Sequence, residues 1–444
     1  MKPKQPNNHP DLFRSQLSQI IKLSHPLCRL STKINWDRLE QKIDMLYSEG
    51  VGQPPLPTRL MVGLHYLKYT FDESDESVVE RWVENPYWQY FCGYDFLQHE
   101  LPCDPTSLTR WRNRVGDKLD ALLEETILVA QETNALKRTA IKHVNVDTTV
   151  QEKAIAFPTD ARLYQKMRVK LVREAKKQGI RLRQTYRFVG KKAFIMQGRY
   201  ASARQMKRAA KQTRKLKTYL GRVSRDIERK SPSNKKAMQD LLVLAKRLIK
   251  QHRHDKNKLY SIHEPEVKCI AKGKIHKPYE FGQKASFVTT STGNWVIGAQ
   301  SLTDNPYDGH TLSGALKQAE EFTGVVPEFA YVDQGYRGHK IMGKTKVHIV
   351  GRIPKRAKPS VRRWMKRRAS IEPSIGHLKS DYRLSRNFLK GEAGDHANVV
   401  LAASAYNLAK LLKWFYSVFF LKQIINLLLS ENQTNLKNSP DFGW

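Results

Sequence analysis

Three acidic residues stand at positions from which they could act on one substrate. Asp147 lies in the apolar run HVNVDTTV, Asp333 ends the run EFAYVD, and Glu372 lies in the basic stretch RRASIEPSIGHLKSDYRLSRN. Carboxylates that crowd into a small volume repel one another unless a cation neutralises them. Hard oxygen ligands with open coordination positions suit Mg²⁺ or Mn²⁺. Two such ions, about 3.5–4 Å apart, can activate a water or a 3′ hydroxyl and stabilise the leaving oxygen of a phosphodiester.

The charge of the chain indicates a polyanionic partner. The 444 residues include 78 Lys and Arg against 42 Asp and Glu, a formal net charge of +36. Residues 161–260 alone contain 32 Lys and Arg against 5 Asp and Glu. Such an excess favours a nucleic acid as the partner over a basic protein without one. Combined with the three acids, it predicts metal-dependent chemistry on a phosphodiester.

Each acid also has a simpler interpretation. A lone Asp at the end of a strand is usually a turn residue, and Glu372 alone could face the dipole at a helix start. The case for a shared site therefore rests on the order of elements that carry all three. Asp160, in FPTD, is interpreted as a turn or cap residue, with an outer-shell metal ligand as the alternative. Asp308 is interpreted as an N-cap and His310 as a surface or capping residue.

Alternating apolar residues and turn signals predict the elements that would hold the acids. Strands are predicted at 141–150, 277–290, 293–302, 327–333 and 346–350, with a helix at 310–324 and a basic helical segment to about 387. This order predicts an α/β protein with an RNase H-like mixed sheet flanked by helices. In such a sheet the first and fourth strands can be neighbours, which brings Asp147 and Asp333 together. Because Pro373 would clash inside a helix, the helix with Glu372 either starts at about Ser370 or kinks at the proline.

Composition and pattern divide the chain into four parts. They are a helical N-terminal DNA-binding or dimerisation domain (1–140), an RNase H-like catalytic domain (141–160 and 261–430), a basic helical insertion (161–260) and a tail (431–444).

Two basic segments are candidates for DNA contact. In DPTSLTRWRNRVG, Arg110, Arg112 and Arg114 flank Trp111 on a short capped helix. These arginines either enter a DNA groove, or form a solvated face while Trp111 lies in the core. In the insertion, two apolar stripes predict two helices that are joined by the turn SPSN into a hairpin. The first stripe is Leu216, Leu220, Val223 and Ile227, and the second is Met238, Leu241, Leu242, Ala245, Leu248 and Ile249. The hairpin lies along the DNA backbone or serves as a dimerisation arm; its candidate DNA contacts are Lys211, Arg214, Lys215 and Lys217.

Several function classes are disfavoured. Cys28, Cys92, Cys103 and Cys269 form no C-x-x-C pair, which argues against a zinc site or a disulfide framework. The apolar run 414–429 is interrupted by Lys422 and is shorter than the roughly 20 residues of a membrane span, so a buried or partner-facing helix is predicted rather than a membrane anchor. The start of the chain lacks the apolar stretch of a signal peptide, which predicts a cytoplasmic protein. No nucleotide-binding phosphate loop is present.

The motifs resemble those of one family. VNVDTTVQEKAIAFPTD, HEPEVKCIAKGKIHKPYEFGQK, NPYDGHTL, YVDQGYRG and RRASIEPSIGHLKSDYRLSRN resemble blocks of bacterial insertion-sequence transposases of the DDE class, in the branch that includes insertion sequence five. The resemblance extends from about Trp36 to Lys413. It implies that Asp147, Asp333 and Glu372 are the catalytic triad. The signature Tyr-x2-Arg-x3-Glu-x6-Lys maps onto Arg368, Glu372 and Lys379, with Met365 in place of the tyrosine. Arg368, Lys379 and His377 are then expected to contact DNA.

The resemblance also implies a function. A DDE transposase binds the terminal inverted repeats of its own element, cleaves there, and joins the 3′ ends to target DNA without ATP. It implies double-stranded DNA as the partner, two Mg²⁺ or Mn²⁺ ions, a homodimer in the synaptic complex, no membrane, and a cytoplasmic, nucleoid-associated location in a bacterium. The alternatives are an RNase H-like nuclease that cuts without joining, and a domesticated DNA-binding protein with an idle site.

Overall fold

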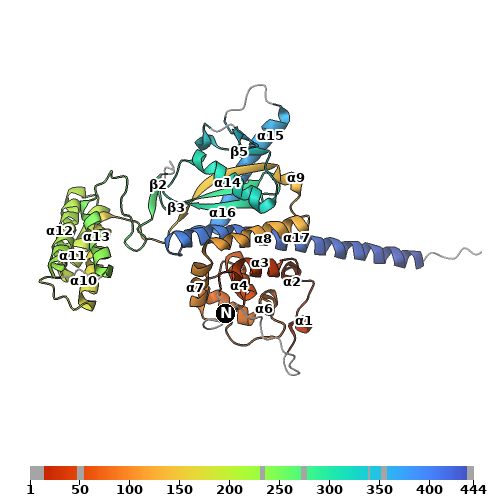
Figure 1. Ribbon diagram of the computed structural model, residues 1–444, viewed down its shortest axis with the longest axis horizontal. Coiled ribbons are helices and arrows are strands. Elements are labelled where there is room, and N and C mark those ends of the chain that lie inside the picture. Colours follow the sequence, from red (N-terminus) through yellow and green to blue (C-terminus); the bar gives the residue numbers. More distant parts are fainter. Residues whose placement is uncertain are drawn as a thin grey trace, which may run out of the picture. The chain divides into compact units, whose positions relative to one another are not determined.

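The computed structural model of the protein describes residues 15–47, 55–230, 236–271, 278–338, 341–351 and 358–437 (Figure 1). The predicted turn at 231–234 and the last seven residues of the predicted tail, 438–444, lie outside these ranges. The chain forms two compact units, one of residues 1–151 with 284–444 and one of residues 152–283.

The first unit begins with short helices, as the sequence predicts. They are α1 (Leu17–Ile20), α2 (Pro26–Ser31), α3 (Trp36–Asp44), α4 (Thr58–Thr70), α5 (Asp75–Glu84), α6 (Pro86–Phe91), α7 (Pro105–Val115), η1 (Gly116–Leu119), α8 (Asp120–Glu132) and α9 (Arg138–Ile141). Local sequence explains several starts. Ser74 and Ser77 form a capping box on α5, and Asp104 caps α7 by accepting a hydrogen bond from the Thr106 N–H. α4 has Pro57 at its N-cap.

A mixed sheet forms the centre of the α/β region. Its strands are β1 (His143–Glu152), β2 (Lys268–Ala271), β3 (Tyr279–Thr290), β4 (Val296–Leu302), β5 (Phe329–Val332), β6 (Ile341–Met342) and β7 (Thr345–Ile349). In the first unit the strand order is β4-β3-β1-β5-β7-β6. β3 and β4 are antiparallel, whereas β1, β5 and β7 run parallel. The predicted turn between β3 and β4 is confirmed, with Gly293 and Asn294 both at positive φ, as a tight hairpin turn requires.

The remaining helices of this unit follow the predicted order. They are α14 (Asp308–Thr323), η2 (Gln334–Tyr336), α15 (Pro359–Arg367), η3 (Arg368–Ser370), α16 (Ile371–Ser380) and α17 (Gly391–Lys437). α14 ends at Gly324, which adopts the left-handed conformation that favours glycine at this position. Of the two alternatives for the helix with Glu372, the start at about Ser370 is confirmed, because α16 begins at Ile371 and Pro373 lies in its first turn.

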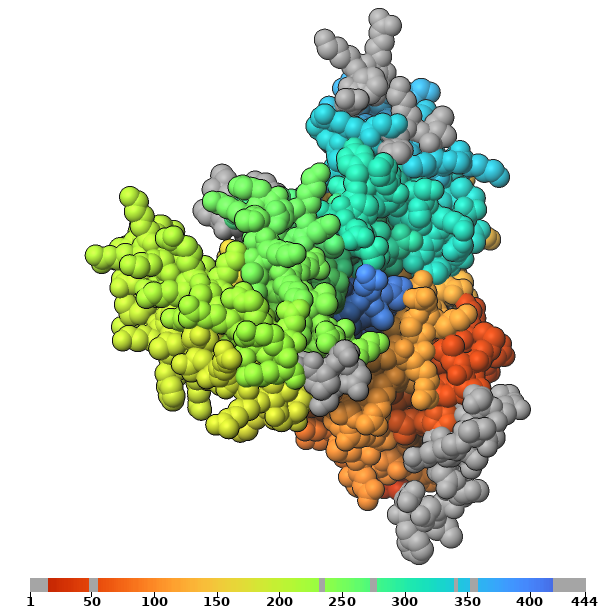
Figure 2. All heavy atoms as spheres, turned by 60° about the vertical axis from the view of Figure 1, so that its left-hand side comes forward, coloured from red at the N-terminus to blue at the C-terminus, as the bar shows by residue number. Residues whose placement is uncertain are grey.

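Helix α17 joins the sheet to the N-terminal helices. Between residues 397 and 408 its side chains are buried on nearly every face, and the helix contacts α2, α4, α8 and β4. Figure 2 accordingly shows a small part of α17 (blue) between the sheet region (cyan) and the N-terminal helices (orange). Its buried Asn407 donates to the Val296 carbonyl at 2.7 Å and accepts from the Val296 N–H at 3.1 Å. The helix thereby satisfies backbone groups of the edge strand β4.

The second unit has its own helical core. Its helices are α10 (Asp160–Lys177), α11 (Arg187–Ser202), α12 (Met206–Lys230) and α13 (Lys236–Lys250), and β2 pairs there with the start of β3. The predicted stripes on α12 and α13 are confirmed as buried, except for Ile249, which is partly buried. The insertion is nevertheless more than a two-helix hairpin, because α10 and α11 also pack on this core. Two helices that pack through narrow apolar stripes leave apolar side chains exposed along both sides of their contact, and further helices can cover these side chains.

No helix within the described residues is long and apolar enough to cross a membrane.

Candidate active site

The sheet brings the two aspartates together, as predicted. β1 and β5 are paired neighbours, and their register runs from His143 opposite Phe329 to Asn145 opposite Tyr331. Asp147 and Asp333 each lie two residues beyond the last of these pairs. Since parallel strands in register advance together, both carboxylates reach the same edge of the sheet.

One arginine contacts all three predicted acids. An Arg368 Nη2 lies 2.7 Å from an Asp147 oxygen and 3.7 Å from an Asp333 oxygen. The Nη1 of the same guanidinium donates to Glu372 at 2.7 Å. Arg368 is 12% exposed, and the exposure of the acids rises from 15% at Asp147 through 42% at Asp333 to 62% at Glu372. The acids therefore line a site that is closed at the strand side and open at the helix side.

Backbone and side-chain hydrogen bonds orient the two strand acids. The Thr148 N–H donates to Asp147 at 2.8 Å, and the Gly335 N–H donates to Asp333 at 2.8 Å. A Cβ added to Gly335 would lie 2.9 Å from an Asp333 oxygen and 2.9 Å from an oxygen of Asp308. Glycine is thus required for space at this point, where the chain turns between two carboxylates.

The prediction that Asp308 is an N-cap is wrong. Asp308 is the first residue of α14, Tyr307 is the N-cap, and no side chain caps the helix. Instead the Asp308 carboxylate accepts hydrogen bonds from the Thr148 hydroxyl at 2.8 Å and from Lys284 at 2.9 Å. The Asp308 carboxylate bonds to these residues instead of capping the helix because Lys284 is a largely buried cation that needs a counter-charge. Asp308 is therefore a fourth acid beside the site, and its partner Thr148 also orients Asp147.

A buried amide anchors the helix acid to the strand. Asn145 precedes Asp147 by two residues, so both side chains lie on the same face of β1. The Asn145 amide donates to the Ser370 hydroxyl at 3.3 Å and to the Arg367 carbonyl at 3.4 Å, and its oxygen accepts from Ser291 at 2.8 Å. These bonds hold η3 against the sheet, and η3 carries Arg368 and leads into the first turn of α16.

The residues of the site fit a divalent cation. Three carboxylates already converge on one positive group, and oxygen-only ligands are what Mg²⁺ and Mn²⁺ prefer. In the described part of the chain, no three Asp, Glu, His or Cys side chains lie close enough together to hold a metal ion. The Nε of Arg368 is buried and makes no hydrogen bond within the described residues. A metal would thus replace a guanidinium that is itself incompletely satisfied.

A buried phenol, that of Tyr336, lies close to the site acids. Tyr336 follows Asp333 in η2 and is fully buried. Burial first, and then the charges of Asp147 and Asp308, raise the pKa of Tyr336 well above its usual range. The tyrosine therefore adds no negative charge to a site that already holds four carboxylates.

The predicted DNA contacts fall into separate places. In α16, His377 is exposed and lies 2.8 Å from Asp381, and Lys379 lines a cavity near the end of the helix. In α7, Trp111 and Arg112 are buried, whereas Arg110 and Arg114 are exposed. Of the two interpretations of α7, core packing therefore holds for Trp111, and the three arginines do not share one face.

The remaining predicted residues lie in the second unit. In α12, Lys211, Arg214 and Lys215 are exposed and Lys217 is partly exposed. Asp160 lies in the first turn of α10, where it forms an ion pair with Lys258 at 3.7 Å. In the first unit, His310 is exposed and packs against the Tyr307 ring.

Comparison with known proteins agrees with this geometry. Residues 15–114 match the family described as Transposase domain (DUF772), and residues 248–408 match the family described as Transposase DDE domain. The chain is 51% identical over 207 residues to the uncharacterized protein ORF8 in the nfe locus of Rhizobium meliloti; the match covers 46% of this chain and all of the relative. The chain belongs to the insertion-sequence DDE transposase family. No solved structure is significantly similar to it.

One of the three predicted acids lies outside the residues that match the two families. Asp333 and Glu372 lie within the residues that match the Transposase DDE domain, whereas Asp147 lies between the two matched segments. Its pairing strand and its ion pair with Arg368 place Asp147 beside the other two acids of this DDE transposase.

We predict that Arg368→Gln destabilises the metal-free protein and strengthens its response to Mn²⁺. Removing the guanidinium leaves three carboxylates to repel one another, which should lower the thermal midpoint by about 5 °C. It also removes the group that competes with a metal for the acids. Differential scanning calorimetry in EDTA and in Mn²⁺ measures both effects.

The matched control is Arg363→Gln, which removes an exposed arginine from the neighbouring helix α15. It should change neither midpoint by more than about 1 °C. A Mn²⁺ shift in Arg368→Gln no larger than in the wild type would show that the arginine and the metal do not share these acids.

A second prediction concerns the anchor of the helix. Asn145→Ala should lower the thermal midpoint by about 5 °C, because it breaks the bonds to Ser291 and Ser370 in a buried place. It should also weaken Mn²⁺ binding, since η3 is no longer held against the strand. Isothermal titration calorimetry measures the binding below the unfolding range.

Asn407→Ala is the control, because this amide is equally buried but bonds to β4 and Thr126. It should destabilise the protein to a similar extent and leave Mn²⁺ binding unchanged. If both variants bind Mn²⁺ like the wild type, Asn145 supports the fold and not the site.

Proposed function

We propose that this protein is the active transposase of its own insertion sequence. It binds the ends of the element, hydrolyses a phosphodiester at each end, and joins the resulting 3′ ends to target DNA. The observation that carries the proposal is the contact of Asp147, Asp333 and Glu372 with a single cationic group. In a family of DDE transposases, this convergence supports assigning the catalytic triad to these three residues.

The site residues have distinct tasks in this proposal. Asp147 and Asp333 are held by the sheet of an RNase H-like catalytic domain and form the fixed side of a metal site. Glu372 lies on a more exposed helix and completes the site when Arg368 withdraws. Divalent ions, two in number and either Mg²⁺ or Mn²⁺, would activate the attacking oxygen and stabilise the leaving one. Thr148, Lys284 and Asp308 orient Asp147 from behind.

DNA binding is assigned to other parts of the chain. The N-terminal helices and the basic insertion bind DNA, and two protomers bring two element ends together. For the insertion, the supporting observation is the excess of Lys and Arg in residues 161–260. Charges of this density remain on the surface of a helical unit, where they can neutralise phosphates.

Substituting any one acid should abolish strand cleavage without abolishing DNA binding. Asp147→Asn, Asp333→Asn and Glu372→Gln are each expected to lower cleavage by at least about a thousandfold, because each removes one metal ligand. Cleavage is measured on DNA that carries the native flanks of the gene, and binding by gel shift in EDTA. Near-wild-type cleavage by one variant would remove that residue from the triad. Glu321→Gln is the control, since it removes an exposed carboxylate of α14 that pairs with Lys317 on the same helix.

Neutralising four cations of α12 should weaken DNA binding for all sequences. The variant replaces Lys211, Arg214, Lys215 and Lys217 with Gln. Its plot of log affinity against log salt should be shallower than that of the wild type, by up to about 3.6 in slope. Fluorescence anisotropy with specific and unrelated duplexes measures this slope. An unchanged slope would contradict phosphate contact and favour a dimerisation arm, which analytical ultracentrifugation of the same variant would then reveal.

One reaction separates the proposal from its alternatives. Purified protein, Mg²⁺, native flanking DNA and a supercoiled plasmid are incubated together, with Asp333→Asn in parallel. Joined products from the wild type alone would support transposition. Cleavage without joining would favour a nuclease, and binding without either would favour a DNA-binding protein with an idle site.

A further inference from the structure

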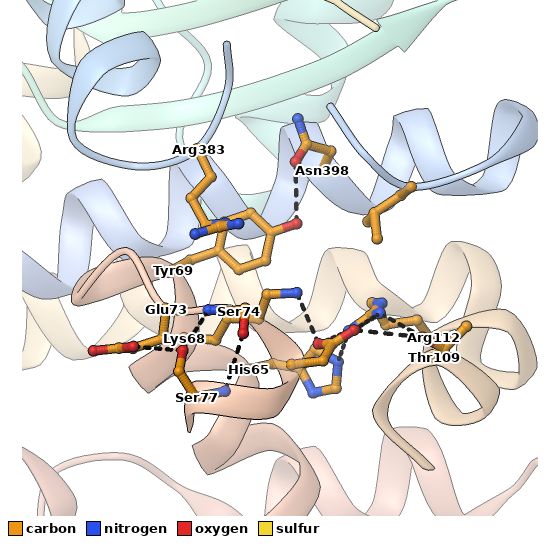
Figure 3. Close-up of polar contacts among 12 residues, drawn as sticks. His65, Lys68, Tyr69, Glu73, Ser74, Ser77, Thr109, Arg112, Arg383 and Asn398 are labelled. Carbon is orange, nitrogen blue, oxygen red and sulfur yellow. Dashed lines mark hydrogen bonds and ion pairs between the residues drawn. The ribbon is translucent and has the colours of Figure 1, made fainter. Parts of the chain in front are cut away.

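A second cationic site lies in the first unit, apart from the three acids. A cavity of 640 Å³ is bounded on one side by Lys68, Asp75 and Arg112 of the N-terminal helices. Its other side is formed by Arg383 and by the segment from Phe388 to Ala397. A smaller cavity of 200 Å³ has Lys68, Arg383, Phe388 and Leu389 in its lining too, and Lys379 and Arg386 complete its positive wall. Figure 3 shows Lys68 and Arg112 converging from one side and Arg383 reaching in from the other.

The buried wall of this site carries more positive than negative charge. Lys68 donates to Asp75 at 2.7 Å, and Arg112 donates to both oxygens of the same carboxylate at 2.8 and 2.6 Å. Two buried cations thus share one anion. His65 adds no charge, because burial and the neighbouring Arg112 lower its pKa to about 3.

The pKa of Lys68 reflects this imbalance. Burial first, and then the charge of Arg112, lower it to about 8, although Asp75 opposes the change. A cation at the wall of a cavity that is short of counter-charge gains from the arrival of an anion.

The exposed wall adds to the same excess. The linings of the two cavities together hold six cations (Lys68, Arg112, Lys379, Arg383, Arg386 and Lys390) and three carboxylates (Asp72, Asp75 and Glu76). Asp72 is already engaged by Arg383 at 2.8 Å. Lys390 makes no ion pair within the described part of the chain, and its side chain is exposed. The net charge of this lining is +3, so the site as a whole favours an anionic ligand.

We propose that this cationic site binds a backbone phosphate of a DNA strand together with its sugar. This inference rests on the proposed function, since it requires DNA as the partner. Arg383 and Lys390 bind the phosphate oxygens, and the buried Lys68–Asp75–Arg112 group supplies the background of positive charge.

The shape of the site favours a phosphodiester over a free inorganic anion. A volume of 640 Å³ lies in the range of sites for small organic ligands, well beyond what one phosphate fills. Leu389, Ala393 and Ala397 give the cavity an apolar floor, which suits the carbons of a deoxyribose. The ring of Phe388 is 65% exposed at the edge of the site, with the Arg386 guanidinium 5.8 Å from its centre.

The position along α16 also fits a DNA strand. Glu372 lies in the first turn of this helix, and Lys379 lies seven residues later beside the cationic site. Seven residues of α-helix span about 10 Å, which is about three nucleotides along one strand of B-DNA. A strand that presents its scissile phosphate to Glu372 therefore can present a nearby phosphate to Arg383 and Lys390.

The test combines two variants with single-phosphate neutralisation. Fluorescence anisotropy in EDTA measures the affinity of a duplex with the native flanks for the wild type, Arg383→Gln, Lys390→Gln and the double variant. Lys317→Gln is the matched control, because it removes an exposed lysine from α14. The double variant should bind about tenfold more weakly, and the dependence of log affinity on log salt should become shallower by about 0.9, the value for one phosphate. The control should change neither value.

The second part locates the phosphate. A series of duplexes carries one uncharged methylphosphonate at successive positions near the element end. At one or two neighbouring positions the substitution should weaken wild-type binding several-fold and have no further effect on the double variant. Lys390→Gln alone should show the same coupling in part, and because it breaks no ion pair within the described residues, loss of fold cannot account for it.

The remaining outcomes overturn the inference. A flat methylphosphonate series, or a double variant that binds like Lys317→Gln, contradicts a phosphate site here. Stabilisation of the wild type by inorganic phosphate, without any coupled position, means an adventitious ion only. Competition by an acidic peptide with a flat series means a protein partner. No DNA binding by the wild type overturns the proposed function as well, whereas binding without coupling overturns this inference alone.

Discussion

Three carboxylates can share a small volume only when a positive charge lies among them. In this protein the charge is the guanidinium of Arg368, which holds Asp147, Asp333 and Glu372 in one cluster. The graded exposure of the acids shows which one can adjust. The two aspartates are set by paired strands, whereas Glu372 lies on a helix start that is open to solvent. A ligand that replaces the guanidinium therefore needs to move the helix side of the site more than the sheet.

The same requirement for charge balance extends behind the acids. Lys284 neutralises Asp308. Thr148 links the two acids, because its hydroxyl donates to Asp308 and its backbone N–H donates to Asp147. Farther along the strand, the buried Gln151 amide donates to the Asp395 carbonyl and accepts from Asn398 of α17. Polar groups at this depth are tolerated because they are paired, and each pair specifies which residues must meet. β1 is thus fixed at both ends, at Asn145 and at Gln151.

Much of the fold and of the site follows from local patterns in the sequence. Alternating residues predict β1, β3 and β4, and the order of elements predicts that the strands of Asp147 and Asp333 are neighbours, as they are. Glycine and asparagine at the β3–β4 turn carry their own conformational signal. These predictions succeed because each depends on short-range periodicity or on the few ways in which such elements can be connected.

The contacts that distinguish this protein could not be predicted in the same way. Alternating arginines in α7 resemble a solvated face, and nothing near Arg112 shows that Asp75, 37 residues earlier, would draw it into the core. In the sequence Asp308 looks like a helix cap, but its carboxylate pairs with Lys284 instead. The packing of α10 and α11 with α12 and α13 also joins residues that are far apart in the sequence. A side chain's partner is decided by tertiary approach, about which local periodicity carries little information.

Charged residues have two different electrostatic roles in this chain, and they are distributed unevenly along it. Residues 161–260 have a net charge of +27, so the other 344 residues share the remaining +9 of +36. Repulsion within the insertion is spread over exposed helical faces, where solvent and salt screen it. In the first unit, by contrast, largely buried cations pair with particular carboxylates, as Arg368, Lys284 and Arg112 do. A dense exposed positive charge attracts DNA of any sequence, whereas a buried cation paired with particular carboxylates fixes the positions of those carboxylates. The four carboxylates are thus balanced by cations of their own unit, whereas the dense charge of the insertion belongs to the other unit.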